Sequence, residues 1–591
     1  MRVLISIRKI VKKLSIILSK EHKKLGIVVL LMSLIGAIIE TLGVSVIFPL
    51  VQVMMEPEAL LNNRYIFKLY TSLELKSVKQ LLGIVVTIVI IIYILKNAYL
   101  CILSYVRVKY SSKVQRELSI HMLYSYMNRG YDFFRKNNTS RLLNGINDAV
   151  GGVYNIIYQA MRMFAEGLTI VCIFIYILYT DAVMAISMIV LVGTCLLVIL
   201  SIFKKIMEKA GKKYFDYRVL TNKWSLQLFS GVKELLVTQR ADYFVKQYEN
   251  AYQERQDGQI KQTLAIETPA YVIEGACVTG IILAVFFRIG NVENPTEYVP
   301  KLAVFAMAAF RLLPSIGRIT SYFNDCIFNF AAVDEVYENV LESKKFIGCK
   351  PQENVLTDDT NINFEKELCI RNIEWTYADG TEKVLDGLSV VIKKGEAVAF
   401  IGSSGGGKST LVDIILGLLN PQKGEVLLDN YNICSCKKAV AKLIGYVPQS
   451  VYLIDDSIKR NIAFGIADED IDENAIWDAL EKAQIDDYIK KLPEGIETIV
   501  GERGVRFSGG QAQRLAIARA LYSDPEILIL DEATSALDND TEKAVMQAID
   551  SLQGKKTLII VAHRLTTIRN CDKIFEIIEG KAIEKKYDQI I

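Results

Sequence analysis

The chain has 591 residues, of which 51% are hydrophobic, with a mean hydropathy of +0.26 and a formal net charge of +3. This length predicts more than one domain, and the apolar content is high for a soluble protein. The small net charge identifies no class of partner, and ten scattered cysteines with only three histidines support neither a zinc site nor a disulfide framework.

The first 24 residues are basic, with eight Lys or Arg and one acid. They contain neither a long apolar core nor a small-residue cleavage site, so they do not resemble a signal peptide. The pattern VLISIRKIVKKLSIIL predicts a cytoplasmic amphipathic segment that lies near the lipid headgroups. A solvated basic tail is the alternative interpretation.

Six segments supply the roughly 20 apolar residues that a membrane-spanning helix needs. They are Leu25–Val53, Leu81–Val106, Ile156–Tyr179, Ala182–Phe203, Ile266–Ile289 and Ala303–Phe323. The sixth departs from the pattern because it contains Arg311, Pro314 and Arg318. We therefore predict a membrane α-helical domain with six spans over residues 1–325, followed by a linker over 326–366.

The distribution of basic residues predicts the orientation of the spans. The segment KKIMEKAGKK after the fourth span is basic, whereas the loops Tyr179–Asp181 and Gly290–Val299 carry no Lys or Arg. The first outer loop contains four basic residues and departs from this rule. The N-terminus and residues 367–591 are then cytoplasmic, as are two long helix-prone connections, about Lys109–Tyr154 and Lys204–Ala265.

Charged residues inside the spans are costly there and are usually functional or paired. They are Glu40, Lys96, Glu166, Glu274, Arg311 and Arg318. Arg311 and Arg318 are seven residues apart and share a helix face. If that face lines a central cavity, it offers two guanidinium groups, which suit phosphate. The alternatives are pairing with Glu40 or Glu274, or a position beyond the hydrocarbon.

A phosphate-binding pattern follows in the last third of the chain. The stretch IGSSGGGKST, residues 401–410, contains Gly-x-x-x-x-Gly-Lys-Ser between an apolar run typical of a buried strand and a run with helical periodicity. The glycines allow backbone N–H groups to surround phosphate oxygens at a helix N-terminus. In this pattern Lys408 reaches the β- and γ-phosphates and Ser409 binds Mg²⁺.

Further motifs surround this loop. ILILDEATSALD is a predicted buried strand that ends in Asp531, a metal-binding carboxylate, and Glu532 follows as a general base. FSGGQAQRLAIARAL begins at Phe507 and opens a second helix suited to an anion. Gln449 and His563 each follow an apolar strand, and Tyr377 precedes the loop. Each of these three taken alone also fits a structural role.

In combination the motifs resemble the nucleotide-binding domain of ABC transporters over residues 367–591, an α/β P-loop ATPase. The resemblance implies an A-loop aromatic at Tyr377, a Q-loop glutamine at Gln449 that also binds metal, and a switch histidine at His563. It implies that Glu532, His563 and Gln449 are catalytic, and that Asp531, Ser409 and Gln449 hold Mg²⁺. ATP would contact Gly402, Ser403, Ser404, Gly405, Gly406, Gly407, Lys408, Ser409 and Thr410, and the signature residues Ser508, Gly509, Gly510 and Gln511.

The signature begins with Phe507, where the family usually has Leu, but its phosphate-facing residues are retained. In this family the signature of one subunit completes the ATP site of the other, so one motif set per chain implies a homodimer. The fused membrane domain, with its two long cytoplasmic segments, resembles that of ABC exporters. The resemblance implies that residues near FRKNNTSRLL and SLQLFSGVKELL contact the ATPase domains.

Short patches of the membrane half resemble one exporter branch, which includes the bacterial lipid-linked oligosaccharide flippase of protein N-glycosylation. These patches are ETLGVSVIFPLV, FFRKNNTSRLLNGI and RLLPSIGRI, and NRYIFKLYTSLELKS resembles an external helix of that flippase. The implied cargo is a polyprenyl-pyrophosphate-linked glycan, flipped across the cytoplasmic (inner) membrane, with Arg311 and Arg318 on the pyrophosphate. Membrane lipids are the other expected partners, and no nucleic acid is expected.

Other functions share much of this pattern. A multidrug, peptide or other lipid exporter has the same architecture and would need an apolar or acidic cavity for its cargo. An ATP-gated channel or regulator is disfavoured because Glu532 and His563 are both present. The predicted spans exclude a soluble ABC ATPase of translation or chromosome maintenance, and an importer usually carries its two domains on separate chains.

Overall fold

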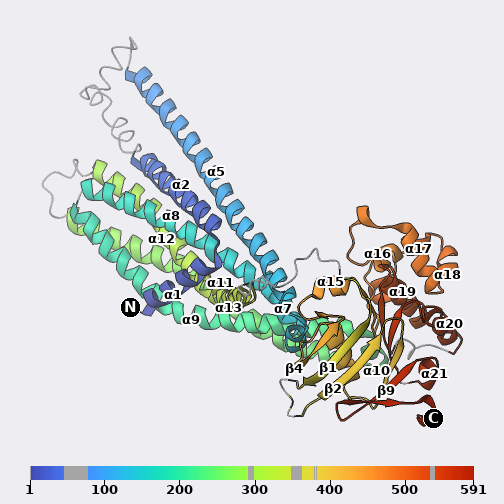
Figure 1. The fold of residues 1–591 in the computed structure, drawn as a ribbon. Helices are drawn as coiled ribbons and strands as arrows, with labels where there is room; N and C mark the ends of the chain where they lie inside the picture. Colours follow the sequence, from blue (N-terminus) through green and yellow to red (C-terminus); the bar gives the residue numbers. More distant parts are fainter. Residues whose placement is uncertain are drawn as a thin grey trace. The chain divides into compact units, whose positions relative to one another are not determined.

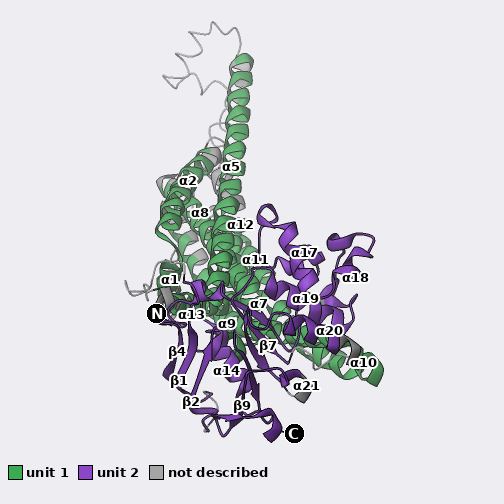
Figure 2. Ribbon diagram, turned by 45° about the vertical axis from the view of Figure 1, so that its right-hand side comes forward, with its two compact units in different colours: residues 1–129, 133–348 green, residues 130–132, 349–591 purple. Residues whose placement is uncertain are grey.

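The computed structural model describes residues 2–45, 78–180, 182–289, 299–347, 362–377, 380, 382–532, 539–562 and 564–590. Two compact units divide the chain (Figure 2). The first comprises residues 1–129 and 133–348, and the second comprises residues 130–132 and 349–591. The predicted linker thus contributes to both units, since its first half is helical and belongs to the first.

The described part of the first unit is helical (Figure 1). Its long helices are α1 (Arg2–Ile17), α2 (Lys20–Ser45), α5 (Val78–Met127), α8 (Val150–Thr180), α9 (Ala182–Ser230), α11 (Ala241–Ile289), α12 (Val299–Phe328) and α13 (Phe330–Ile347). The short α6 (Tyr131–Lys136), α7 (Thr139–Asn144), a π-helical turn (Gly145–Ala149) and α10 (Val232–Thr238) connect them.

The second to sixth predicted spans each lie inside one continuous helix, namely α5, α8, α9, α11 and α12. The first span begins in α2, and its residues 46–53 lie outside the described residues. By length and hydropathy alone, three stretches of the described chain could cross a membrane, Lys20–Leu42, Val86–Met127 and Thr139–Ile175. With 50 residues, α5 is about 75 Å long, well beyond a hydrocarbon core of about 30 Å.

The long helices are exposed and apolar in the predicted spans, and they form a buried core beyond the spans. In the predicted spans large apolar side chains face outward, and Ile94, Leu95 and Ile175 are each more than 60% exposed. Such a surface needs lipid to cover it. Beyond the spans the same helices form a buried core with α13, in which Val114, Val153 and Val333 are at most 1% exposed.

One glycine sets how closely α9 and α12 approach. A Cβ on Gly211 would lie 2.0 Å from the carbonyl oxygen of Phe328, which no real side chain tolerates. Gly211 is therefore required for this close approach of two backbones. Phe328 and Met207, one turn before the glycine, are both buried in the cluster that this approach creates.

The second unit contains two sheets. The four-stranded sheet is antiparallel, in the order β2 (Leu385–Lys393), β1 (Glu367–Trp375), β4 (Lys423–Leu428), β5 (Tyr431–Asn432). The six-stranded sheet has the order β10 (Lys581–Lys585), β9 (Lys573–Ile578), β3 (Ala397–Ile401), β8 (Thr557–Val561), β7 (Ile527–Asp531), β6 (Ile444–Val447). All its pairs are parallel except β9 with β10.

Helices surround the six-stranded sheet. They are α14 (Lys408–Ile415), α15 (Lys437–Ala441), α16 (Ile458–Ile462), α17 (Glu473–Lys482), α18 (Asp486–Lys490), α19 (Gly509–Leu521), α20 (Asn539–Asp550) and α21 (Leu565–Ile568). Every residue of β7 and β8 is buried, which explains why these strands are continuous apolar runs in the sequence.

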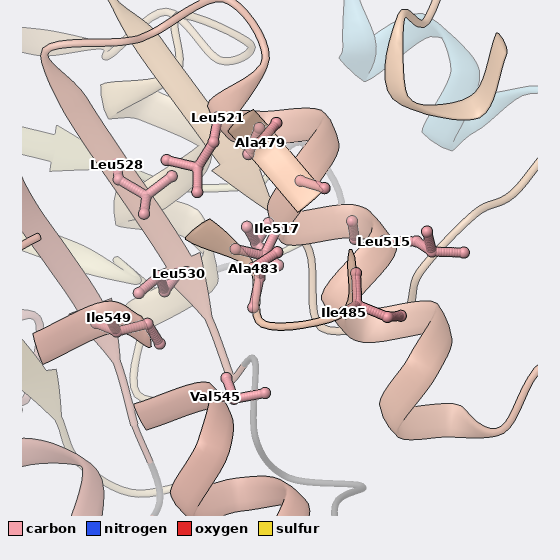
Figure 3. Packing of buried hydrophobic residues seen from close by; sticks show 14 of the residues in the cluster. Ala479, Ala483, Ile485, Leu515, Ile517, Leu521, Leu528, Leu530, Val545 and Ile549 are labelled. Carbon is pink, nitrogen blue, oxygen red and sulfur yellow. The ribbon is translucent and has the colours of Figure 1, made fainter. Parts of the chain in front are cut away.

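Successive residues of β7 enter different cores, as strand geometry requires. Leu528 and Leu530 pack with Leu521 of α19 and Ile549 of α20, beside small side chains such as Ala479 of α17 (Figure 3). The alternate residues Ile527 and Ile529 join the cluster that also contains residues of the four-stranded sheet. The sheet is thus fixed from both faces, and its strand ends are rigid supports for a site.

Candidate functional site

Four predicted site segments leave the same edge of the six-stranded sheet. The strands β6, β7, β8 and β3 are neighbours and run parallel. Their carboxyl ends lead to Gln449, Glu532, Ala562 and the loop that starts at Gly402. Residues far apart in the sequence are therefore brought to one edge, the usual location of ligand sites in such sheets.

The phosphate-binding loop has a backbone that requires glycine. It connects β3 to α14, and Gly402, Gly405 and Gly407 have φ angles of +142°, +82° and +99°. A Cβ on Gly402 would also lie 2.7 Å from the carbonyl oxygen of Ile577. The predicted strand, loop and helix are all present, and the loop precedes the N-terminus of α14, where N–H groups favour an anion.

Lys408, the first residue of α14, folds back across this loop. Its Nζ donates to the carbonyl oxygens of Gly402 at 2.8 Å and Ser403 at 2.9 Å, and the residue is 5% exposed. Burial lowers the pKa of Lys408, and the nearby Glu532 and Asp531 oppose that change. The ammonium group is thus held over the loop by two carbonyl oxygens.

Tyr377 is connected to the same helix. Its hydroxyl lies 2.6 Å from Oγ1 of Thr410, and its ring meets that of Trp375 edge to face at 6.1 Å. Tyr377 is thus fixed to the phosphate-binding segment by a side-chain hydrogen bond. This contact gives Thr410 a role in positioning the ring, which its place in the motif alone did not indicate.

The acidic pair lies at the end of β7. Asp531 is 7% exposed. Burial raises the pKa of the neighbouring Tyr446, and the charge of Asp531 and a hydrogen bond to it raise this pKa further. Glu532 has a φ of +47°, a left-handed conformation that is rare for a non-glycine residue and is often found at functional sites. Nε2 of Gln449 donates to Oε2 of Glu532 at 2.5 Å.

The signature segment forms the N-terminus of α19. Ser508 caps this helix, since its Oγ accepts from the N–H of Gln511 at 3.3 Å and its own N–H donates to Oε1 of Gln511 at 2.9 Å. This reciprocal pair is a capping box. Phe507 packs against the ring of Tyr488 at 6.2 Å, so the unusual first residue serves as an apolar contact.

Several predicted residues lie outside the described part of the structure. They are His563 and residues Ser535–Asp538, the end of the stretch ILILDEATSALD. The remaining predicted ATP-site residues are described, and they occupy the loop, the sheet edge, the α19 N-terminus and, for Tyr377, the segment after β1. Their assigned roles remain predictions.

A polar cavity of about 320 Å³ lies within the first unit, between α2, α5, α8 and α12. Its charged lining residues are Glu40, Arg107, Arg162, Glu166 and Arg318. Three guanidinium groups and two carboxylates leave one positive charge in excess. Two tyrosines and several hydroxyl groups complete the wall, so the cavity is suited to a polar anionic group.

The guanidinium groups are held in different ways. Nε of Arg318 lies 2.7 Å from Oε1 of Glu166. The Arg162 guanidinium lies over the ring of Tyr322, 4.3 Å from its centre. Nη2 of Arg107 donates to Oγ of Ser33 at 3.1 Å, and its buried Nε has no hydrogen-bond partner within the described residues. An oxyanion in the cavity would satisfy this Nε.

The cavity alters the sequence-based hypothesis for the cargo site. Arg318 lines it, but the pairing alternative also holds for this residue, with Glu166 as partner instead of Glu40 or Glu274. Glu40 lies in the same cavity and accepts from Thr169 at 3.3 Å. Arg311 lies in α12, and its side chain is outside the described part of the structure.

Sequence analysis missed Arg107 and Arg162. Arg107 lies one residue beyond the predicted second span, and Arg162 was not counted among the charges of the third. One signal was available, because Arg162 precedes Glu166 by four residues and the two must share a face of α8. Only the packing of four helices shows that these residues meet Arg318.

Two family models match the chain. The ABC transporter model matches residues 385–535, and the model of the ABC transporter transmembrane region matches residues 26–309. The first covers the phosphate-binding loop, the signature and Asp531 together with Glu532. The second covers the second to fifth predicted spans in full, the first span except its first residue, and the beginning of the sixth.

Similar proteins include several named ATP-dependent lipid A-core flippase. That of Cupriavidus metallidurans is 30% identical over 465 residues, which are 77% of this chain and 75% of that protein. That of Cupriavidus pinatubonensis is 28% identical over 485 residues, 80% of this chain and 79% of that protein. Multidrug resistance protein 1 of Entamoeba histolytica is 31% identical over 395 residues, 62% of this chain and 29% of that protein.

One similar solved structure is described as a bacterial Atm1-family ABC exporter with ATP bound. It aligns with a TM-score of 0.74 at 19% identity and covers 96% of each chain. At this identity the likeness concerns the fold.

Proposed function

Because this chain belongs to the ABC transporters, as an ATP-driven exporter with its membrane and ATPase domains fused, we propose that it flips a polyprenyl-pyrophosphate-linked oligosaccharide across the cytoplasmic membrane. The observation that carries the proposal is the cavity that Arg107, Arg162 and Arg318 line. One guanidinium group can donate two hydrogen bonds to two oxygens of a phosphate. The excess positive charge of the cavity favours a pyrophosphate over a neutral or cationic drug.

The residues of the ATPase site fit ATP and Mg²⁺. The loop from Gly402 to Gly407 has the backbone that a triphosphate requires, and the carbonyl oxygens that now hold Lys408 can be exchanged for phosphate oxygens. Asp531, Ser409 and Gln449 supply the oxygen ligands that Mg²⁺ prefers. The metal, when bound, neutralises charge on the phosphates.

The hydrolytic step rests on Glu532. Its carboxylate would accept a proton from the attacking water, and Gln449 donates a hydrogen bond to one oxygen of this carboxylate. His563 would hold the γ-phosphate. Each chain has one signature and one phosphate-binding loop, so we infer a homodimer in which the α19 N-terminus of one subunit completes the ATP site of the other.

The names of the relatives favour a second candidate within the same chemistry. Lipid A-core is also a glycolipid, and the same arginines would serve its anionic groups. Export of a drug is the third candidate function. The three guanidinium groups of the cavity would repel a cationic drug, so such a cargo would have to bind elsewhere.

The test is a flipping assay in proteoliposomes. Purified protein receives a fluorescent polyprenyl-pyrophosphate oligosaccharide, lipid A-core or a cationic drug, with ATP, and the fraction that crosses the bilayer is measured. ATP-dependent crossing of the first substrate, lost with Glu532→Gln, would support the proposal. Crossing of lipid A-core or of the drug alone, from protein that hydrolyses ATP, would overturn it.

A further inference from the structure

A second cavity, of about 610 Å³, lies in the first unit where α1 meets α2. It is separate from the arginine-lined cavity and shares none of its lining residues. Its wall also includes residues of α5 and α13. The volume falls within the range of about 300–1,000 Å³ that is typical of small-molecule sites.

The wall of this cavity has an apolar part and a basic part. The apolar part consists of Ile16, Ile17, Leu18, Val114, Leu118 and Val340. The basic part consists of Lys20 and Lys23, both exposed, which form no ion pair with the described residues. Such a combination suits a ligand with an apolar chain and an anionic head.

The acid in the wall does not cancel this charge. Oε2 of Glu117 lies 2.8 Å from Nε2 of His22, and its Oε1 lies 3.8 Å from Nζ of Lys113. Glu117 therefore already has two partners on the protein side. The two lysines are left as the free cations of the cavity rim.

The position of the cavity indicates where the ligand comes from. The α1 helix is amphipathic and basic, and such helices lie in the plane of the membrane surface. α2 begins the first predicted span, three residues after α1 ends. The lysines at this junction are thus at the level of lipid headgroups, where anionic lipids attract basic residues.

We propose that this cavity binds an anionic phospholipid, with its phosphate at Lys20 and Lys23 and part of an acyl chain against the apolar wall. The bound lipid would also contact α13, which is the last described helix before the ATPase unit in the sequence. Val340 of α13 lines the cavity, and Nζ of Lys13 on α1 lies 2.6 Å from Oδ1 of Asp334 on α13. A lipid that fixes α1, α5 and α13 together would raise the rate of ATP hydrolysis.

Two measurements test this proposal on the full-length protein. Native mass spectrometry counts bound phosphatidylglycerol against phosphatidylcholine, and ATP hydrolysis is compared in nanodiscs of phosphatidylcholine with and without phosphatidylglycerol. The double variant Lys20→Gln/Lys23→Gln should bind phosphatidylglycerol about 25-fold more weakly, since each lysine at such a surface contributes about 1 kcal/mol and 1.4 kcal/mol is tenfold. Its hydrolysis should no longer respond to phosphatidylglycerol.

Two further variants separate the cavity from general surface charge. Lys24→Gln removes a neighbouring exposed lysine that does not line the cavity, and it should respond as the wild type does. Ser15→Trp places a bulky side chain at the cavity wall and keeps every charge, and it should weaken phosphatidylglycerol binding. Equal effects of Lys24→Gln and the double variant, or full binding by Ser15→Trp, would overturn the proposal. Neither readout depends on the transported cargo.

Discussion

The side-chain amide of Gln449 donates a hydrogen bond of 2.5 Å to the carboxylate of Glu532. The two residues follow the neighbouring parallel strands β6 and β7, and 83 positions separate them in the sequence. The bond occupies one oxygen of the proposed general base. Glu532 would then accept a proton from water at Oε1, or at Oε2 once Gln449 shifts or shares that oxygen.

Glu532→Gln should abolish turnover and retain nucleotide binding. The amide has the shape of the carboxylate but cannot accept the proton, and loss of a general base typically costs about 10²–10⁴-fold in rate. Phosphate release and the binding of a fluorescent ATP analogue measure the two properties separately. Normal phosphate release by this variant would show that Glu532 is not the base.

The tether between Tyr377 and Thr410 predicts a graded pair of variants. Tyr377→Phe keeps the ring and loses a hydrogen bond, a net contribution of about 1 kcal/mol, so ATP affinity should fall about fivefold. Tyr377→Ala also removes stacking on the base, a contribution of about 1–3 kcal/mol. Titration with the fluorescent analogue checks the order, and equal affinities of the two variants would contradict a stacking role.

Much of the ATPase unit could be predicted because its motifs depend on local chemistry. The loop glycines, the apolar strands and the acids that follow them are each visible within a few residues, and the positive φ angles of Gly402 and Gly407 explain why glycine stands there. The edge where these segments meet follows from parallel strand order. The hydrogen bonds of Gln449 and Tyr377 do not, because they depend on side-chain positions.

The cavity of the membrane unit could be predicted only in part. Sequence analysis identified Glu40, Glu166 and Arg318 as costly charges inside spans, and all three line the cavity. It did not find Arg107 or Arg162. Helical periodicity shows which residues share one face of a helix, but it does not show which other helix packs against that face. Packing between α2, α5, α8 and α12 decides which charges share a space.

Gly211→Ala should destabilise the membrane unit. The new methyl group would lie 2.0 Å from the carbonyl oxygen of Phe328, so α9 and α12 would have to separate and part of their buried core would be lost. Strain of this kind costs about 1–3 kcal/mol. The matched control is Gly193→Ala on the same helix, which meets no atom within 4 Å.

Thermal unfolding in detergent compares the two variants. Gly193→Ala should leave the unfolding midpoint unchanged or raise it, because alanine favours a helix over glycine by about 1 kcal/mol. Gly211→Ala should lower the midpoint. A midpoint equal to that of the wild type would mean that the close approach at Gly211 is not required.

Arg162→Gln should reduce transport of the pyrophosphate-linked oligosaccharide and retain ATP hydrolysis in the absence of cargo. A charge-assisted hydrogen bond contributes about 1.5–3 kcal/mol, so transport at low cargo concentration should fall roughly 10- to 150-fold. Arg162 is the sharpest choice because its guanidinium rests on the ring of Tyr322, whereas Arg318 pairs with Glu166. Removing Arg318 alone would leave the carboxylate of Glu166 without its ion-pair partner. The protein could then lose stability, and a fall in transport could not be assigned to the cargo site.

The pair therefore needs a variant of its own. Arg318→Met/Glu166→Gln removes the positive and the negative charge together, so the net charge of the cavity stays the same while one guanidinium is lost. If the arginines bind the pyrophosphate by geometry, this double variant should also lose transport. If only the net charge matters, it should transport normally while Arg162→Gln fails. Full transport by both would remove the cavity from the path of the cargo.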